Sequence, residues 1–190
     1  MIYESIINRR TIRRFKQQTV PKEVLRRCAE AARLSPSGMN MQPLKYIIVN
    51  DKKLLPEVFS TLTWARSIPG FKHAPDEVPA AYIVMLLDTK LREQADNDAG
   101  IAAMSISMVA FEEGVASCIL GSIDRAKLAK ILKFPESLKI LLVVALGYPA
   151  EKSKAVEMKG EDIKYWYDAD RVLNVPKRSP KDTVTWNTEK

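Results

Sequence analysis

The sequence predicts an α+β domain in which one β-sheet lies between layers of helices. Leu138–Gly147 is apolar almost throughout, which is typical of a strand covered on both faces. Residues 99–111 are apolar nearly all round, which is typical of a helix buried on most sides. Residues 24–32 repeat apolar side chains at the spacing of a single helical face. Because strands and helices of these kinds alternate along the chain, we expect a sheet sandwiched between helices.

Length and composition are those of one globular domain. The chain has 190 residues, of which 46% are hydrophobic and 28% charged, and we expect residues 1–190 to form a single domain. The formal net charge of +7 favours anionic ligands. No apolar run approaches the roughly twenty residues that cross a bilayer, and the N-terminus lacks the apolar stretch of a signal peptide. We therefore expect a cytoplasmic protein that binds no membrane.

Few side chains are available for a metal site or a nucleophilic triad. Cys28 and Cys118 are isolated, and neither has the spacing of a metal ligand, so we interpret both as buried structural thiols. His73 is the sole histidine, and nothing around it suggests a Ser-His-Asp triad. The chain also lacks a GxGxxG or a GxxxxGK[ST] loop. The sequence therefore disfavours a His/Cys metal site, a Ser-His-Asp triad, a Rossmann dinucleotide site and a P-loop nucleotide site.

The N-terminal third predicts two helices and a strand. Residues 2–8 suit a short helix that ends at an arginine-rich segment. Pro21 suits the first turn of a second helix that runs to Leu34. Residues 46–49 form a β-branched run that predicts a buried strand.

The next stretch predicts a helix, a long loop and a second strand. Residues 52–63 suit a helix if Pro56 lies in its first turn. Residues 64–79 are rich in proline and mixed charges, and they predict an irregular loop that serves either as a lid over a pocket or as a variable surface loop. Residues 81–87 predict another buried strand.

A central helix and two more strands complete the predicted sheet. Residues 96–114 predict a helix capped by Asn97 or Asp98, buried either within the domain or at a subunit interface. Residues 116–122 predict a strand, followed by a helix that Ser122 or Asp124 can cap. After Leu138–Gly147 the composition becomes charged and polar, and residues 150–190 predict an extended tail without a core of its own.

Two segments are candidates for ligand binding. The loop from Leu34 to Pro43 offers short polar side chains at Ser37, Asn40 and Gln42, and Gly38 would let a ligand approach the backbone. The same residues are also those of an ordinary surface turn. Upstream, four arginines lie within residues 9–14, and their forked guanidinium groups match phosphate geometry. Alone, this cluster also suits a solvated turn or a nucleic-acid contact.

Taken together and in this order, the two segments resemble the nitroreductase family of FMN-dependent NAD(P)H oxidoreductases. The matching stretches are Arg9-Arg10-Thr11-Ile12-Arg13 and Ser35 to Pro43. The resemblance implies a three-layer α-β-α sandwich with a central mixed, mostly antiparallel sheet. It also implies a homodimer with FMN at the subunit interface and a C-terminal tail, residues 150–190, exchanged with the dimer partner.

The resemblance further implies which residues bind FMN. Arg9 would reach the phosphate or ribityl chain with help from Arg10 and Thr11, and Arg13 would lie near the N1/O2 edge of the ring. The neighbouring subunit would lend its loop, and the strand end would bring a backbone amide to N5. The remaining residues implied in cofactor binding are Pro36, Ser37, Gly38, Asn40, Leu120, Gly121, Lys177 and Arg178.

The implied reaction is ping-pong hydride transfer from NADH or NADPH to FMN, followed by reduction of a small acceptor such as a nitroaromatic or a quinone. No protein group is implied as acid, base or nucleophile. Leu44 stands where many relatives have Trp, and Gly38-Met39 replaces a pair of small hydroxyl residues, so the shape of the acceptor pocket is not implied.

Three alternatives remain open at this stage. The first is another flavin reaction, such as dehalogenation, enone reduction or flavin reduction. The second is a flavin-binding sensor without turnover. The third is a basic protein that binds nucleic acid through residues 9–14, whose binding would weaken steeply with salt.

Overall fold

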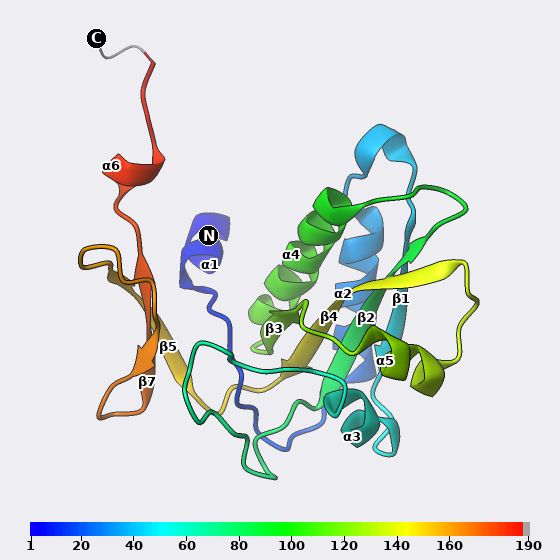
Figure 1. Ribbon diagram of the computed structural model, residues 1–190, viewed down its shortest axis with the longest axis horizontal. Helices are drawn as coiled ribbons and strands as arrows, with labels where there is room; N and C mark the ends of the chain where they lie inside the picture. Colours follow the sequence, from blue (N-terminus) through cyan, green and yellow to red (C-terminus); the bar gives the residue numbers. More distant parts are fainter. Residues whose placement is uncertain (188–190) are drawn as a thin grey trace.

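The computed structural model describes residues 1–187, and its centre is a four-stranded antiparallel sheet (Figure 1). The strand order is β1-β2-β4-β3. Each strand lies where an apolar run was predicted, with bounds β1 Leu44–Val49, β2 Ala81–Asp88, β3 Ala116–Leu120 and β4 Leu138–Gly147. β2 and β4 are the inner strands, which explains why their residues are apolar on both faces.

Helices cover both faces of this sheet, so the predicted three-layer sandwich is confirmed. Alternate residues of β2 point to opposite sides: Ile83 and Met85 join one core, whereas Tyr82 and Val84 join the other. The first core is covered by α2 (Lys22–Leu34) and α4 (Asp96–Glu112). The second is covered by α3 (Leu54–Phe59) and α5 (Arg125–Leu132).

Gly147 is the last residue of β4, and the N-terminal segment crosses the strand there. Phe15, which is fully buried, packs on the Gly147 backbone, and a Cβ there would lie 2.9 Å from the Phe15 ring. Only glycine leaves room for this contact. The crossing brings the arginine segment to the edge of the sheet, where the candidate site lies.

One apolar face of the sandwich has no cover within the described residues. Ile101, on the side of α4 away from the sheet, is 44% exposed. Beside α4 lies α1 (Ile2–Asn8), which Ser5 fastens through a hydrogen bond to Glu112. Ile2, Tyr3, Ile6 and Ile7 of this helix are all exposed. Exposed apolar patches of this kind mark interaction surfaces.

The tail forms more structure than the sequence predicted. β5 (Lys152–Glu157), β7 (Val172–Lys177) and β6 (Trp166–Tyr167) make a second sheet that projects from the sandwich (Figure 1). β5 pairs with β7 in parallel within this second sheet, whereas the four strands of the central sheet pair antiparallel, and α6 (Pro180–Thr183) follows. Asp168 stabilises the sheet by accepting hydrogen bonds from the Val172 N–H and the Asn174 amide at 2.9 and 3.0 Å. The sequence did not predict these strands, because they are short and their charged residues interrupt any regular spacing of apolar side chains.

The structure corrects some predictions about helix ends and confirms that both cysteines are buried. The prediction that Asn97 or Asp98 caps the central helix is wrong, because α4 begins after Ala95 without a side-chain cap. Asp124 does cap α5, accepting the Lys127 N–H at 3.0 Å. α3 is shorter than predicted, with Pro56 in its first turn. Cys28 and Cys118 are both buried, as predicted. In residues 1–187 no helix is long and apolar enough to cross a membrane.

Candidate functional site

The arginine segment runs along the exposed edge strand of the sheet. Thr11 forms a parallel bridge with Ser117 of β3, and the Ile12 N–H donates to the Ser117 carbonyl at 3.1 Å. Leu120 and Gly121 lie at the other end of the same short strand. The structure therefore places Thr11 and Gly121 at opposite ends of one strand, roughly 13 Å apart at 3.3 Å per residue.

Arg9 lies at a cavity of about 300 Å³ beside the start of β3. Its Nε is buried and has no hydrogen-bond partner in the described part of the chain, and the same is true of Ser153 Oγ on the same cavity. Burial, and then the charge of Arg10, lower the pKa of Arg9. An unpaired buried cation is costly. An anionic group in this cavity would satisfy Arg9 and Ser153 at once.

Arg10 makes its hydrogen bonds to the end of α1. Its guanidinium donates to the Ile7 carbonyl and, at 3.5 Å through Nε, to the Asn8 carbonyl, at the C-terminal end of α1. A cation there balances the partial negative charge of a helix end. Arg10 lines the cavity, and its Nε and Nη2 atoms each donate one hydrogen bond to this helix end.

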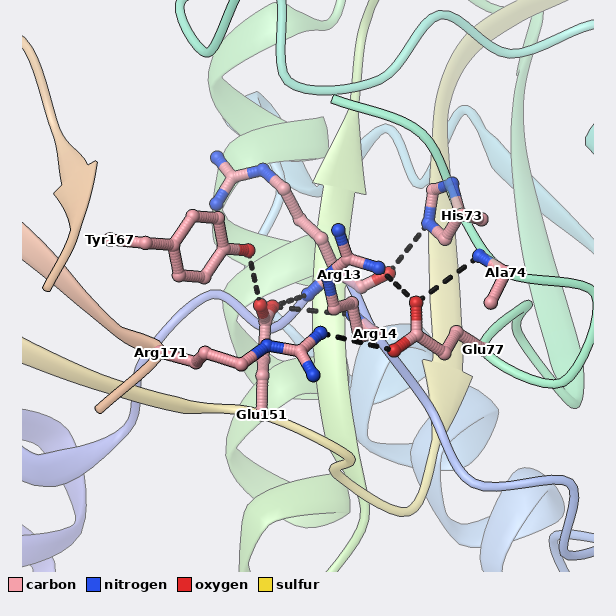
Figure 2. Close-up of polar contacts among 8 residues, drawn as sticks. All are labelled: Arg13, Arg14, His73, Ala74, Glu77, Glu151, Tyr167 and Arg171. Atoms are coloured by element: carbon pink, nitrogen blue, oxygen red, sulfur yellow. Dashed lines mark hydrogen bonds and ion pairs between the residues drawn. The ribbon is translucent and has the colours of Figure 1, made fainter. Parts of the chain in front are cut away.

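Glu151 holds the backbone of the arginine segment (Figure 2). Its carboxylate accepts hydrogen bonds from the Arg13 N–H, the Arg14 N–H and the Tyr167 hydroxyl. The Arg13 side chain is not used in these contacts, and its guanidinium lies 5.0 Å from the centre of the Tyr165 ring. Glu151 thus fixes the main chain of residue 13 and leaves the charged end to interact elsewhere.

Arg14 fastens the 64–79 loop to the same segment. It pairs with Glu77, which also accepts the Ala74 N–H at 3.2 Å and lies 3.9 Å from Arg171 (Figure 2). Burial alone would raise the pKa of Glu77, but the Ala74 N–H and Arg14 outweigh it and lower the pKa. As predicted, the loop has no helix or strand, yet it is tied to both the arginine segment and the tail.

His73 is a structural contact in this loop. Its Nε2 lies 2.7 Å from the Arg13 carbonyl, so the neutral ring donates there. The aromatic rings of Phe59, Trp64 and Phe71 approach it edge-on, with centroids 4.8–5.1 Å away. Burial is the main cause of its lowered pKa. No acid or nucleophile pairs with the ring in a triad within residues 1–187.

The candidate loop has an unusual backbone. Three residues other than glycine, Met39, Asn40 and Gln42, have φ between 48° and 54°. Such left-handed residues cost free energy and gather at functional sites. The Ser37 hydroxyl accepts the Gln42 N–H at 3.0 Å and holds the turn closed. The Asn40 side chain is exposed, as a ligand contact would require.

Gly38 contacts two residues that lie far along the chain, Arg92 and Asp98. Its N–H donates to Asp98 Oδ1 at 3.1 Å, and Arg92 fills the space where its side chain would be, with Nη1 2.5 Å from an ideal Cβ. Arg92 in turn lies 3.6 Å from Asp98. The absence of a side chain at Gly38 therefore gives room to Arg92.

The loop and the Arg9 cavity lie at different ends of α4. The loop cavity, about 220 Å³, is lined by Pro36, Ser37 and Asp98, whereas the Arg9 cavity is lined by Ser107 of the same helix. Nine residues separate Asp98 from Ser107, which is roughly 13 Å at 1.5 Å per residue. Within one chain the structure does not bring the two predicted halves of the site together.

Lys177 and Arg178 also lie apart from Arg9. Ser153 pairs with Leu173, and Lys177 follows four residues later on β7, roughly 13 Å along the strand. Ser153 and Glu151 are the tail residues that reach the site, and sequence reasoning missed both. They stand in a lysine-rich stretch where only the folded pairing reveals their burial.

Among residues 1–187, no cluster of three or more His, Cys, Asp or Glu side chains could hold a metal ion. The polar groups that remain without partners at the Arg9 cavity are donors. Because the Arg9 Nε and the Ser153 hydroxyl can both donate, the pair suits an anion.

Comparison with known proteins identifies the family and the fold of the chain. Residues 6–148 match the model of the nitroreductase family. A protein of Archaeoglobus fulgidus, provisionally named NADH dehydrogenase/NAD(P)H nitroreductase, is 29% identical, over 89% of this chain and 91% of its own. Iodotyrosine deiodinase of Thermotoga neapolitana is 27% identical, over 78% of this chain and 89% of its own. An FMN-dependent nitroreductase of Clostridium difficile has the same fold at 23% identity, with a TM-score of 0.71 and coverage of 98% and 99%.

Proposed function

Because the chain belongs to the nitroreductase family, we propose that it is an FMN-dependent oxidoreductase that uses NADH or NADPH to reduce a small organic acceptor. Bound FMN would take a hydride from the nicotinamide and deliver electrons to the acceptor in a ping-pong sequence. The acceptor class we propose is nitroaromatic or quinone. No protein acid, base or nucleophile is required in this assignment.

One observation carries the proposal: at the Arg9 cavity, Arg9 Nε and Ser153 Oγ are buried and have no hydrogen-bond partner among residues 1–187. The phosphate of FMN supplies three acceptor oxygens and a negative charge, which match such donors. Arg9 and Ser153 would bind this phosphate, and Thr11 would contribute from the adjacent strand edge. Arg10 would act mainly through its charge, since its Nε and Nη2 atoms already donate to the end of α1.

Arg13 and Gly121 would contact the ring. The Arg13 guanidinium would lie near N1 and O2, where a fixed positive charge stabilises the charge gained on reduction. Leu120 and Gly121, at the end of β3, would bring a backbone N–H to N5. Glu151 supports this arrangement by holding the Arg13 main chain.

We further propose that the working form is a homodimer with FMN at its interface. The second copy would bring Pro36, Ser37, Gly38 and Asn40 to the site, because one chain holds them at the far end of α4. The uncovered apolar side chains of α1 and α4 would form the contact between copies. Residues 150–190 would pack on the partner subunit and extend the single domain, which could also bring Lys177 and Arg178 to a phosphate.

A second candidate reaction is reductive dehalogenation. The iodotyrosine deiodinase similarity, which spans most of both chains, favours it. Leu44 and the 64–79 loop, tied down by Arg14 and Glu77, would shape the acceptor pocket in either case. The two candidates differ in the acceptor alone.

The test is a visible absorption spectrum of the purified protein, followed by anaerobic addition of NADH or NADPH. We expect flavin bands that bleach with at least one nucleotide and return when a nitroaromatic or quinone is added. Recovery with a halogenated phenol only would favour dehalogenation. Bands that neither nucleotide bleaches would favour the sensor alternative, and a protein that takes up no FMN would overturn the proposal.

A further inference from the structure

Arg125 lies where β3 ends and its neighbour continues. The last pair between these strands is Leu120 with Val143, whereas β4 extends back to Leu138 along β2. The edge of β4 before Val143 therefore has no strand beside it. The Arg125 guanidinium binds at this edge, donating from Nε to the Ile140 carbonyl at 3.0 Å and from Nη2 to the Leu141 carbonyl at 3.1 Å.

The Leu141 carbonyl needs such a partner because its strand is irregular there. Leu142 and Ile140 oppose consecutive residues of β2, so Leu141 is an extra residue, as in a β-bulge. A bulge residue falls outside the ladder of backbone hydrogen bonds. Arginine has several donors in a fixed planar fork, so one side chain satisfies neighbouring carbonyls together.

The same Nη2 also reaches the residue that follows β3. It lies 3.4 Å from the Gly121 carbonyl. On its other side, residues 121–124 are held by the Thr63 N–H, which donates to the Ser122 carbonyl at 3.0 Å, and by the Thr61 carbonyl, which accepts the Asp124 N–H at 2.8 Å. Two independent sets of contacts thus fix this short segment.

The segment keeps a free donor although it is held on both sides. Outside the β-ladder, the Gly121 and Ser122 N–H groups donate no backbone hydrogen bond within residues 1–187. The planar peptide that contains the Gly121 carbonyl carries the Ser122 N–H, so the Arg125 contact fixes this Gly121–Ser122 peptide. The preceding peptide, which carries the Gly121 N–H, is fixed by the pairing of Leu120 with Val143. Such an arrangement suits an amide that must be presented to a ligand in one orientation.

The position of Arg125 in its helix also calls for an explanation. It is the first residue of α5, and a positive charge at a helix N-terminus opposes the helix dipole. Asp124 already caps this end. Nothing in the helix itself therefore favours arginine here, whereas the three carbonyl contacts do.

We infer that Arg125 is a positioning residue for the flavin, acting through Gly121 and not by direct contact. It holds the Gly121–Ser122 peptide against β4 while Leu120 is paired with Val143, so Gly121 is fixed on both sides and its N–H meets N5 of the ring in one orientation. This inference rests on the proposed function, which puts Leu120 and Gly121 beside the ring. Loss of the fork would weaken this hydrogen bond and leave the phosphate contacts of Arg9 unchanged.

The test uses the FMN-loaded protein with Arg125→Gln, Arg125→Lys and a control, Lys127→Gln, which removes a positive charge from the same turn of α5. The readouts are the affinity of sulfite, which adds to flavin N5, and the two-electron midpoint potential. We expect about tenfold weaker sulfite binding and a potential about 30 mV lower, the equivalent of tenfold for two electrons, in both Arg125 variants. Arg125→Lys should behave like Arg125→Gln, because lysine keeps the positive charge but lacks the forked donors of arginine. Lys127→Gln should match the wild type in sulfite affinity and midpoint potential.

Two results would overturn the inference. One is wild-type sulfite affinity and potential in Arg125→Gln that still binds FMN. The other is a wild-type response in Arg125→Lys, which would mean that charge alone matters.

Hydrogen exchange of the FMN-free proteins gives an independent readout, with faster exchange expected at residues 120–124 but not across α5. Faster exchange throughout α5 and β4 would indicate a merely structural role. A wild-type protein without flavin bands would instead refute the proposed function, and that result is seen before any variant is made.

Discussion

At the scale of single residues, the buried Nε of Arg9, which has no partner in the described part of the chain, makes the most specific demand for a ligand. We expect Arg9→Gln to bind FMN about 10- to 100-fold more weakly, because a hydrogen bond to a charged group contributes about 1.5–3 kcal/mol. Fluorescence titration of FMN into the FMN-free protein measures this. Arg26→Gln is the matched control, since exposed Arg26 pairs only with Glu23 on its own helix. Equal affinities for the two variants would contradict the assignment of the phosphate cavity.

Ser153 makes a weaker demand at the same cavity. We expect Ser153→Ala to weaken FMN binding roughly five- to tenfold, the equivalent of about 1 kcal/mol for one hydroxyl hydrogen bond. The same substitution should leave the affinity of riboflavin, which lacks the phosphate, unchanged. A parallel loss of riboflavin affinity would show that Ser153 acts on the fold and not on the phosphate.

His73 predicts how stability depends on pH. Its pKa is lowered in the folded chain, mainly by burial, whereas in the unfolded chain it is near 6.5. The unfolded state therefore binds more protons at this residue, so the free energy of unfolding should fall as the pH drops through about 6.5. Because His73 is the sole histidine, urea unfolding between pH 7.5 and 5.5 isolates its effect.

His73→Gln keeps a donor for the Arg13 carbonyl and removes the titration. Its free energy of unfolding should change less than that of the wild type over the same pH range. Identical slopes for the two proteins would show that His73 is not the group responsible.

Residues differ in how far the sequence could predict them. Arg9 and Thr11 follow from a short motif, and the structure places both at the strand edge expected for a ligand site. Ser153 could not be predicted, because its burial depends on the parallel pairing of β5 with β7. Gly38 was interpreted from its own flexibility, yet its role depends on Arg92, which is distant in the sequence.

At the scale of elements, long apolar runs predicted strands and helices because burial on both sides of a sheet leaves a continuous pattern. β2 and β4 were therefore found, together with α2 and α4. The sheet in the tail was not found, since only Leu173 and Asn174 are buried in β7 and β6 has two residues. Its stability comes from side-chain hydrogen bonds at Asp168 that no periodicity reports.

The crossing of the N-terminal segment over β4 gives a test of element packing. We expect Gly147→Ala to lower the free energy of unfolding by about 1–3 kcal/mol, because its Cβ would overlap buried Phe15. In Gly38→Ala the new Cβ meets only the flexible end of Arg92, so the change should stay within about 0.5 kcal/mol. Chemical unfolding of both variants tests the contrast, and a smaller loss for Gly147→Ala than for Gly38→Ala would contradict it.

At the scale of the whole molecule, the uncovered apolar face predicts assembly. We expect Ile101→Glu to give a monomer in sedimentation experiments and to lose FMN, because the charge would lie in the contact between copies. Lys130→Glu, on α5 across the sheet, is the control and should leave the dimer intact. A dimeric Ile101→Glu protein with normal FMN content would place the interface elsewhere.

The central claim is that one FMN site is built from the Arg9 cavity of one chain and the 36–40 loop of another. The most direct measurement mixes two weakly binding variants, Arg9→Gln and Ser37→Glu, exchanges their subunits and uses an FMN concentration that fills the wild-type site but neither variant alone. Each mixed dimer would contain one site with both defects and one intact site. Equal amounts with random exchange should therefore bind one FMN for every two dimers. No recovery of FMN binding in verified mixed dimers would contradict the claim, because a site within one chain stays defective in both partners.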